Sequence, residues 1–249
     1  MKAIFVSARS ASTRLPSKAL MKVGDKTTVG FLIDCLKDTK MASEIILCTT
    51  KNKEDDALCE VAASHGVKYF RGSSEDKILR WKNACEEYKV DFFVNVDGDD
   101  LFFDYNLADL VFQQNEKEPA DFIDGQGFYN DVYGISYKGL EKVCATKNSD
   151  QTEFIKTYFE ACEDVLTIEK LHNVPEIYNK KDVRMTLDYE EDFLFFQTII
   201  KHFLSENRQP LFKDIINYIE KNQHLKQINW FRESEWKSNQ KKMIQQAKN

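Results

Sequence analysis

The stretch KAIFVSARSASTRLPSKAL, residues 2–20, opens with six residues that are typical of a short, buried β-strand. The thirteen residues that follow form a loop with four hydroxyl side chains and three cations, Arg9, Arg14 and Lys18. In an open α/β sheet, the loop after the first strand borders the ligand crevice, where cations and free backbone N–H groups converge. The stretch therefore predicts a polyphosphate site, and a solvated basic loop is the alternative.

Strand and helix patterns alternate four times within the first hundred residues. Such alternation specifies a parallel sheet with right-handed crossovers, so we expect an α/β fold with a Rossmann-like, doubly wound mixed sheet. Strand patterns follow at 44–49, 67–70 and 91–96, and helical patterns begin at Thr27 or Thr28 and lie at 54–64 and 75–88.

The pattern changes beyond residue 107. We expect a single domain of residues 1–249, with a smaller α+β lobe at about 121–182 inserted for acceptor binding and dimerisation. Helices are expected at 107–115 and 151–162, strands at 121–124 and 132–137, and a last strand at 183–187 that leads into a helix at 193–204.

Aromatic residues are frequent in this lobe, and they predict a homodimer. A small lobe buries only limited apolar area by itself, and an exposed apolar patch usually marks an interface. The alternative is that these side chains belong to the core. They are Phe122, Phe128, Tyr129, Tyr133, Tyr137 and Phe159.

Composition excludes several classes of protein. The chain is 42% hydrophobic and 31% charged, with only nine Gly and four Pro, which is typical of an ordered globular protein. A formal net charge of −6 argues against a nucleic-acid partner, because such binding needs a large basic face. The sequence has no apolar run of the roughly 18 residues that a membrane span needs, and no signal pattern. We expect a cytoplasmic protein without a membrane partner.

Neither cysteine nor histidine indicates a disulfide framework or a metal site. The six cysteines contain no C-x-x-C pair, so we expect reduced side chains that fill the core of a cytosolic protein. The four histidines have no ligand spacing with cysteine or with each other, which argues against structural zinc.

Carboxylates gather at two places in the pattern. Asp97, Asp99 and Asp100 follow the fourth strand, and Asp188 opens the helix after the last one. If both strand ends lie beside the first loop, these carboxylates and a triphosphate need a cation between them, and Mg²⁺ prefers such oxygen ligands. For each residue alone, a helix cap or a turn is the alternative.

The run Ala8-Arg9-x-x-Ser12-x-Arg14-Leu15-Pro16-x-Lys18-x-Leu20 resembles the signature of the cytidylyltransferases that make CMP-activated sugar acids. These include CMP-Kdo synthetase, acylneuraminate cytidylyltransferase and, most closely, the group of spore-coat polysaccharide synthesis. The resemblance implies a sheet of the nucleotide-diphospho-sugar transferase type. Ala11 and Ser17 stand where relatives usually carry Gly, and both changes stiffen the loop.

Two acidic segments also resemble that family. Asp99 matches the Asp of a Gly-Asp pair that supplies one metal ligand, and Asp188 matches the second metal ligand in a Thr-x-Asp motif. Asp100 and Glu190 depart from the family pattern without touching either match. The stretch from Phe70 to Trp81 is similar to a segment that lies near the base in the spore-coat group.

The resemblance implies a Mg²⁺-dependent transfer of CMP from CTP to a small anionic acceptor, a sugar acid, with release of pyrophosphate. The product would serve surface polysaccharide or glycoconjugate synthesis. Arg9 and Arg14 would hold the β- and γ-phosphates, and Lys18 the α-phosphate. The nucleotide site would consist of Ala8, Arg9, Ser10, Ser12, Lys18, Arg71, Gly72, Ser73, Arg80 and Asp97. The acceptor site would consist of Gln126, Tyr129, Asn130 and Arg184, with a salt bridge to Asp182 or Asp188 as the alternative for Arg184.

Other activities stay open at this point. Within the class, the acceptor could be a sugar phosphate or phosphoglycerate type of molecule, which would give a CDP-linked product. In a different class, the chain could be a glycosyltransferase or a non-catalytic nucleotide-binding regulator. Pyrophosphate release distinguishes these classes, because neither a glycosyltransferase nor a regulator produces it.

Overall fold

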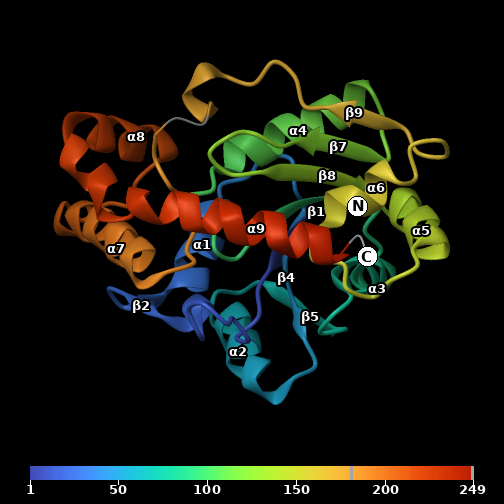
Figure 1. Ribbon diagram of the computed structural model, residues 1–249, viewed down its shortest axis with the longest axis horizontal. Helices are drawn as coiled ribbons and strands as arrows, with labels where there is room; N and C mark the ends of the chain where they lie inside the picture. Colours follow the sequence, from blue (N-terminus) through green and yellow to red (C-terminus); the bar gives the residue numbers. More distant parts are fainter. Residues whose placement is uncertain (180–181, 248–249) are drawn as a thin grey trace.

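The computed structural model of the protein describes residues 1–179 and 182–247, and a seven-stranded sheet lies at its centre (Figure 1). The strand order is β5-β4-β1-β6-β8-β7-β9. The four strands on one side of the sheet run parallel, as the alternating pattern predicts. They are β1 (Lys2–Ser7), β4 (Glu44–Thr50), β5 (Lys68–Gly72) and β6 (Phe92–Asp97).

The other three strands come from the 121–182 segment. β8 (Val132–Ser136) pairs antiparallel with β6, β7 (Phe122–Gly125) pairs antiparallel with β8, and β9 (Ile168–Lys170) pairs parallel with β7. The segment therefore extends the central sheet, and the predicted α/β architecture with a mixed sheet is confirmed. Its use in acceptor binding and dimerisation stays a prediction.

Helices cover both faces of the sheet, because successive strand residues point to opposite sides. In β1, Ile4 and Val6 join one core cluster, and Ala3 and Phe5 join the other. The first cluster includes α1 (Thr28–Leu36), α2 (Asp56–Ser64), α4 (Tyr105–Lys117), α7 (Glu190–Ser205) and α8 (Phe212–Lys221). The second includes α3 (Lys77–Tyr88), α5 (Tyr137–Thr146) and α6 (Ile155–Glu160).

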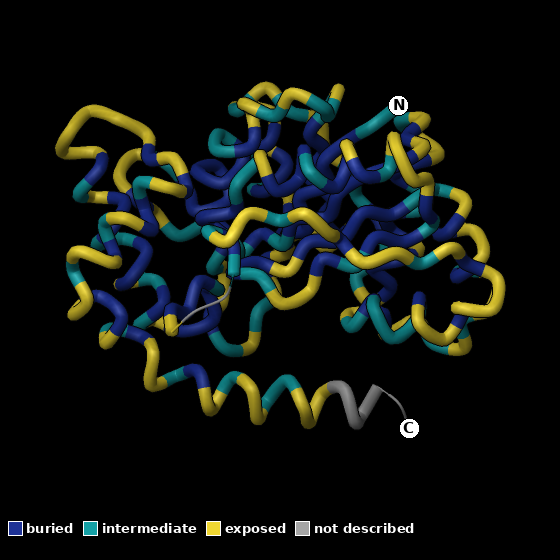
Figure 2. Tube along the Cα trace, turned by 90° about the horizontal axis from the view of Figure 1, so that it is seen from above, coloured by how far each residue is buried: buried dark blue, intermediate teal, exposed yellow. Residues whose placement is uncertain are grey.

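Two further elements lie outside these layers. A short ribbon consists of β2 (Lys22–Val23) and β3 (Lys26–Thr27), and the terminal helix α9 spans Glu233–Ala247. Figure 2 shows the buried sheet at the centre and α9 as a largely exposed helix along one edge of the molecule. Among the described helices, none has both the length and the apolar character that a membrane crossing requires.

The strand expected at 183–187 is absent from the described structure, and this correction affects the site. Residues 183–188 are buried except for the half-buried Thr186, but they run as irregular chain. The edge of β6 that a further parallel strand would need is already paired with β8. Leu187 instead donates a single backbone hydrogen bond to the carbonyl of Asp99, at 3.0 Å. That bond places the start of α7 beside the end of β6.

The argument for a dimer from exposed aromatic residues is wrong. Phe122 and Phe159 are fully buried and stack at 4.4 Å between ring centroids, and Tyr133 stacks on Phe122 at 5.4 Å. Tyr129 is buried against Phe212. These rings fill the monomer's own core, because the segment shares the central sheet. Dimerisation itself stays a prediction.

Candidate active site

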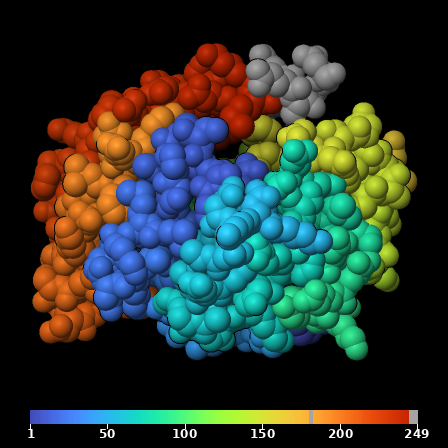
Figure 3. All heavy atoms as spheres, turned by 90° about the horizontal axis from the view of Figure 1, so that it is seen from below, coloured from blue at the N-terminus to red at the C-terminus, as the bar shows by residue number. Residues whose placement is uncertain are grey.

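A cleft of about 800 Å³ opens at the carboxyl ends of β1 and β6. Figure 3 shows the molecule hollowed between the terminal helix, in red, and the N-terminal segment, in blue. Most of the predicted site residues line this cleft. They are Ala8, Arg9, Ser12, Arg14, Lys18, Arg80, Asp97, Asp99, Gln126, Tyr129, Asn130, Arg184 and Asp188.

The loop after β1 is held in shape by a buried carboxylate. The backbone N–H of Ser10 donates to Oδ1 of Asp55 at 2.7 Å, and the N–H of Ser17 donates to the Ser10 carbonyl at 3.1 Å. Ser17 adopts a left-handed backbone with φ of 56°, the conformation that Gly reaches most easily. Ser10, a predicted nucleotide ligand, therefore serves the scaffold of the loop.

Lys18 lies at the centre of the cleft floor. Its Nζ is 2.5 Å from Oδ2 of Asp99 and 3.0 Å from Oδ1 of Asp188. The same Asp188 oxygen accepts from a guanidinium nitrogen of Arg14 at 2.6 Å. The fold thus brings together two carboxylates that the sequence separates widely, as expected. Their metal-binding role remains a prediction.

Burial and neighbouring charges shift the pKa values of Lys18, Asp188 and Asp99 in different directions. Burial disfavours charged Lys18, but the adjacent Asp99 and Asp188 raise its pKa above the ordinary value. Burial also opposes ionisation of Asp188, yet Lys18 and Arg14 hold its pKa well below the usual range. Burial, with Asp188 and Asp97 nearby, raises the pKa of Asp99, and it raises that of Asp100 further. The cleft floor is therefore poor in positive charge for the carboxylates it holds.

These residues fit a divalent cation. Asp99 and Asp188 converge on one point, which the Lys18 ammonium holds in this structure. Mg²⁺ is typically bound by one or two carboxylates together with phosphate oxygens and water. Within residues 1–179 and 182–247, no group of three or more acidic, His or Cys side chains is arranged to hold a metal. Two carboxylates that need a phosphate to complete the ligand set match this chemistry.

A second polar chain lies beside the floor and includes Lys77, which the sequence analysis missed. Lys77 is buried, and its Nζ is 2.6 Å from Oδ1 of Asp97. Asn95 donates to the same oxygen at 3.3 Å and accepts from the Ser7 hydroxyl at 3.0 Å. Burial opposes the charges of both ions, but their attraction lowers the pKa of Asp97 and raises that of Lys77. A lysine in the first turn of a helix normally indicates a solvated surface, so no sequence signal marked it.

The predicted acceptor residues Gln126, Tyr129 and Asn130 line the cleft and make different contacts there. Gln126 accepts from Nζ of Lys156 at 2.6 Å, and Lys156 also pairs with Asp124 at 2.7 Å. Asn130 donates to the Met185 carbonyl at 3.5 Å. The Tyr129 hydroxyl is buried, and burial raises the pKa of Tyr129 to about 12. Lys156, which also lines the cleft, is a second cation that sequence reasoning missed.

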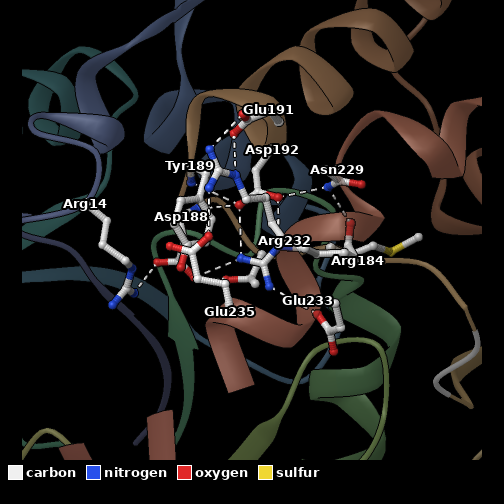
Figure 4. A network of polar contacts seen from close by, with 12 residues as sticks. Arg14, Arg184, Asp188, Tyr189, Glu191, Asp192, Asn229, Arg232, Glu233 and Glu235 are labelled. Atoms are coloured by element: carbon white, nitrogen blue, oxygen red, sulfur yellow. Dashed lines mark hydrogen bonds and ion pairs between the residues drawn. The ribbon is translucent and has the colours of Figure 1, made fainter. Parts of the chain in front are cut away.

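Arg184 was predicted to clamp an acceptor, and the structure corrects this assignment. Its side chain is fully buried, and its nitrogens contact Asp192 at 2.8 and 3.0 Å, Glu233 at 3.2 Å and Asp188 at 3.4 Å (Figure 4). All three nitrogens are therefore engaged by carboxylates of the chain. The alternative of a salt bridge to Asp188 is the one observed.

Among the described residues that line the cleft, the predicted nucleotide ligands Arg71, Gly72 and Ser73 are absent. Arg71 donates to the Thr50 carbonyl at the end of β4 at 2.9 Å and pairs with Asp56 at the start of α2 at 2.6 Å, so it ties β5 to both elements. The Ser73 carbonyl accepts from Arg80 at 2.5 Å. Ser73 thus supports Arg80, which is the one of the predicted nucleotide residues Arg71, Gly72, Ser73 and Arg80 that lines the cleft.

Helix α9 supplies a wall of the cleft that the sequence analysis did not foresee. The lining residues are spaced at helical intervals along one face, while the residues between them are largely exposed. The helix is polar almost throughout, so its composition gave no sign of a cleft-facing side. The lining residues are Glu233, Trp236, Gln240 and Met243.

Comparisons with known proteins find a matching family and several similar proteins. The sequence model of a family described as "Cytidylyltransferase" matches residues 3–248. A protein of Methanocaldococcus jannaschii named "Uncharacterized protein MJ1063" is 32% identical over 230 residues, which are 90% of this chain and 92% of that protein. A 3-deoxy-manno-octulosonate cytidylyltransferase of Leptospira interrogans is 29% identical over 119 residues, which are 46% of each protein.

A solved structure shows the same fold. The cytidylyltransferase from Leptospira borgpetersenii superposes with a TM-score of 0.81 at 28% sequence identity, and the match covers 90% of this chain and 95% of that one. This likeness extends over the mixed sheet, so the expected nucleotide-diphospho-sugar transferase type of fold is confirmed.

Proposed function

Because this chain belongs to the cytidylyltransferase family, and is thus a CTP-dependent nucleotidyltransferase, we propose that it transfers CMP from CTP to a sugar acid with release of pyrophosphate. An acceptor oxygen forms a bond to the α-phosphorus of CTP, and the bond from that phosphorus to the β-phosphate oxygen breaks. The product is a CMP-activated sugar acid. This product would be used in the synthesis of surface polysaccharide or glycoconjugates.

The observation that carries this proposal is the cluster on the floor of the cleft in which oxygens of Asp99 and Asp188 each lie within 3.0 Å of the Lys18 ammonium. In the proposed reaction, Lys18 stabilises charge on the α-phosphate as it develops. Arg14 is 2.6 Å from Asp188, so its guanidinium is at hand for the outer phosphates. Arg9 is 41% exposed in its side chain and pairs with Glu153 at 3.1 Å, a partner that it would exchange for the outer phosphates.

Mg²⁺ completes the proposed site. Asp99 and Asp188 would hold it, and when bound it would neutralise charge on the phosphates. Lys18 would then donate to phosphate oxygens instead of bridging the two carboxylates. The residues of the chain contribute position and charge, which supply most of the catalysis in phosphoryl transfer.

Two observations support an anionic sugar as the acceptor. The Leptospira interrogans relative is named for a sugar acid, 3-deoxy-manno-octulosonate. Lys156 lines the cleft with a side chain that is 25% exposed, and it pairs there with Asp124 and donates to the amide oxygen of Gln126. A cation beside an amide suits a molecule with a carboxylate and several hydroxyls.

Pyrophosphate release tests the proposal directly. Each of the four nucleoside triphosphates is paired with a panel of sugar acids, sugar phosphates and phosphoglycerates, with Mg²⁺ present and omitted. We expect release with CTP and a 2-keto-3-deoxy sugar acid, and only with Mg²⁺. Release with a phosphorylated acceptor alone would replace the sugar acid by that class. No release with any pair would contradict the proposed reaction and favour a glycosyltransferase or a regulator.

A further inference from the structure

The position of the Asp188 carboxylate depends on contacts with neighbouring side chains. One of its oxygens faces Arg14 and Lys18, and the other accepts from Arg184 at 3.4 Å and from the Thr186 hydroxyl at 3.3 Å. Because residues 183–188 lack strand pairing, the backbone gives this side chain little support. Side-chain hydrogen bonds and ion pairs, from within the segment and from outside it, must therefore set its place.

Asp192, in the first turn of α7, supplies much of that support. Its Oδ2 accepts from the backbone N–H groups of Asp188 at 2.9 Å and of Tyr189 at 3.0 Å. Both oxygens also accept from Arg184, and Oδ1 accepts from Asn229 at 2.9 Å. Asp192 is fully buried, so these hydrogen bonds compete with no solvent. One carboxylate thus fixes both the backbone of Asp188 and the guanidinium that contacts its side chain (Figure 4).

The same guanidinium is attached to the terminal helix. Glu233, the first residue of α9, lies 3.2 Å from a terminal nitrogen of Arg184, and the Trp236 ring centroid lies 5.3 Å from its central carbon. Asn229, just before α9, donates to the Arg184 carbonyl at 3.1 Å. Helix α9 is therefore joined to the cluster that holds Asp188, and its later turns line the cleft.

We propose that Arg184 and Asp192 are positioning residues that aim the Asp188 carboxylate at the metal, and that Glu233 transmits the position of α9 to it. This inference rests on the proposed function, because it takes Asp188 as a metal ligand. It assigns the cluster a role in cation affinity that a purely structural ion pair would not have. Groups that orient a metal ligand commonly change metal affinity or activity tenfold to a hundredfold when altered.

Arg184→Lys tests the proposal, because lysine keeps the charge but loses the planar, two-pronged donor. Arg232→Lys is the matched control. Arg232 pairs with Glu191 and Glu235 in the same region and lies over the Tyr189 ring at 4.9 Å, as Arg184 does at 5.4 Å, but among the described residues it forms no hydrogen bond or ion pair with Asp188 or Asp192. Mn²⁺ binding in the presence of CTP is measured by loss of the free-ion electron paramagnetic resonance signal. We expect Arg184→Lys to weaken Mn²⁺ binding at least tenfold and Arg232→Lys less than twofold.

Turnover provides an independent readout. At saturating Mg²⁺, Arg184→Lys should keep a KM for CTP within about twofold of wild type, while the Mg²⁺ concentration for half-maximal rate rises at least tenfold. Near-ultraviolet circular dichroism checks that the variant is folded. A folded Arg184→Lys with wild-type Mn²⁺ affinity would overturn the proposal. An equal loss of Mn²⁺ affinity in Arg232→Lys would overturn it as well.

Glu233→Gln keeps the proposal testable if Arg184→Lys does not fold. It should weaken Mn²⁺ binding about threefold or more, below the tenfold of a group that contacts the metal ligand directly because Glu233 acts through Arg184. Glu235→Gln, the neighbouring surface control, should leave the Mn²⁺ affinity unchanged. Wild-type affinity in Glu233→Gln would remove the link to α9. If wild type binds no Mn²⁺, both this inference and the metal site fail. If Mn²⁺ binds as expected but no acceptor yields pyrophosphate, the proposed reaction fails and the positioning role stands.

Discussion

Asp188→Asn and Asp99→Asn each delete one negative charge from the same site. We expect Asp188→Asn to lower the free energy of unfolding and Asp99→Asn to leave it nearly unchanged or to raise it. Both side chains contact Lys18, at 3.0 and 2.5 Å. Asp188 is only 3% exposed in its side chain and also faces Arg14 and Arg184, whereas Asp99 is 24% exposed. Loss of the Asp188 charge therefore leaves three buried or half-buried cations without their shared partner.

The magnitude follows from the contacts. Removing one partner of a buried ion pair costs about 3–5 kcal/mol, and we expect about 3 kcal/mol for Asp188→Asn because asparagine keeps one acceptor oxygen. For Asp99, burial together with Asp188 and Asp97 raises the pKa, so its ionised form opposes folding at neutral pH. Asp99→Asn should therefore lie within about 1 kcal/mol of wild type, or be more stable.

The pH dependence has a definite sign. Because the pKa of Asp188 is lowered in the folded state, its stabilising contribution is present above the ordinary carboxyl pKa of about 3.9 and is lost as the pH falls through the folded-state value. The stability gap between wild type and Asp188→Asn should accordingly narrow as the pH drops below about 4.

Urea unfolding followed by tryptophan fluorescence, at pH 7 and at steps down to pH 3, measures both effects. Each variant should also lose most of its Mg²⁺-dependent pyrophosphate release, since both carboxylates serve one proposed site. The reasoning is refuted if Asp188→Asn unfolds within 1 kcal/mol of wild type at pH 7, on the scale of an exposed pair. It is equally refuted if Asp99→Asn loses as much stability as Asp188→Asn.

Four further outcomes are expected. Lys18→Ala should lower pyrophosphate release at saturating CTP by about a hundredfold, the usual scale for one transition-state stabiliser, whereas Lys37→Ala, which removes a surface pair with Asp34, should leave the rate unchanged. Ser17→Gly should raise the free energy of unfolding by about 0.5–1 kcal/mol, because it relieves a left-handed backbone at φ 56°. Ala11→Gly should lower the free energy of unfolding by a similar amount. Denaturation curves in which both variants shift the free energy of unfolding in the same direction would exclude this account. Burial raises the pKa of the Cys48 thiol to about 12, so a thiol reagent at pH 8 should label it only after denaturation, as peptide mapping would show. Light scattering at micromolar concentration should report a homodimer, and a monomer mass would end that prediction.

The parallel half of the fold could be predicted because its information is local. β1, β4 and β6 each carry an apolar run, and a helix follows each of the four strands before the next strand of the sheet, so the pattern reveals element type and order. Residues 183–187 show where such reasoning fails. Val183, Met185 and Leu187 are buried as strand residues would be, but a strand also needs a free neighbouring edge, and β8 occupies it. The availability of that edge is a property of the whole sheet.

Some residues of the candidate site could likewise be predicted from the sequence, and others could not. Asp99 and Asp188 could be placed because each lies at the end of a segment that was expected at one edge of the sheet. Lys77 and Lys156 could not, since a lysine on a helix has the same sequence signal whether it is solvated or pairs with a carboxylate across a cleft. Arg184 was misassigned for a related reason, because its partners Asp192 and Glu233 come from two different helices.

The meeting of Lys18 with Asp188 also has a consequence for how the protein matures. These two residues are 170 positions apart in the chain, and Asp99 lies between them. Contacts over such separations close large loops, which makes them late events in folding. The four parallel strands and their helices can assemble from the first hundred or so residues, yet the cleft floor remains incomplete until α7 has docked. A nascent or partly folded chain therefore has the loop after β1 without Asp188 beside it, and the proposed joint binding of metal and CTP would be gained only when that contact forms.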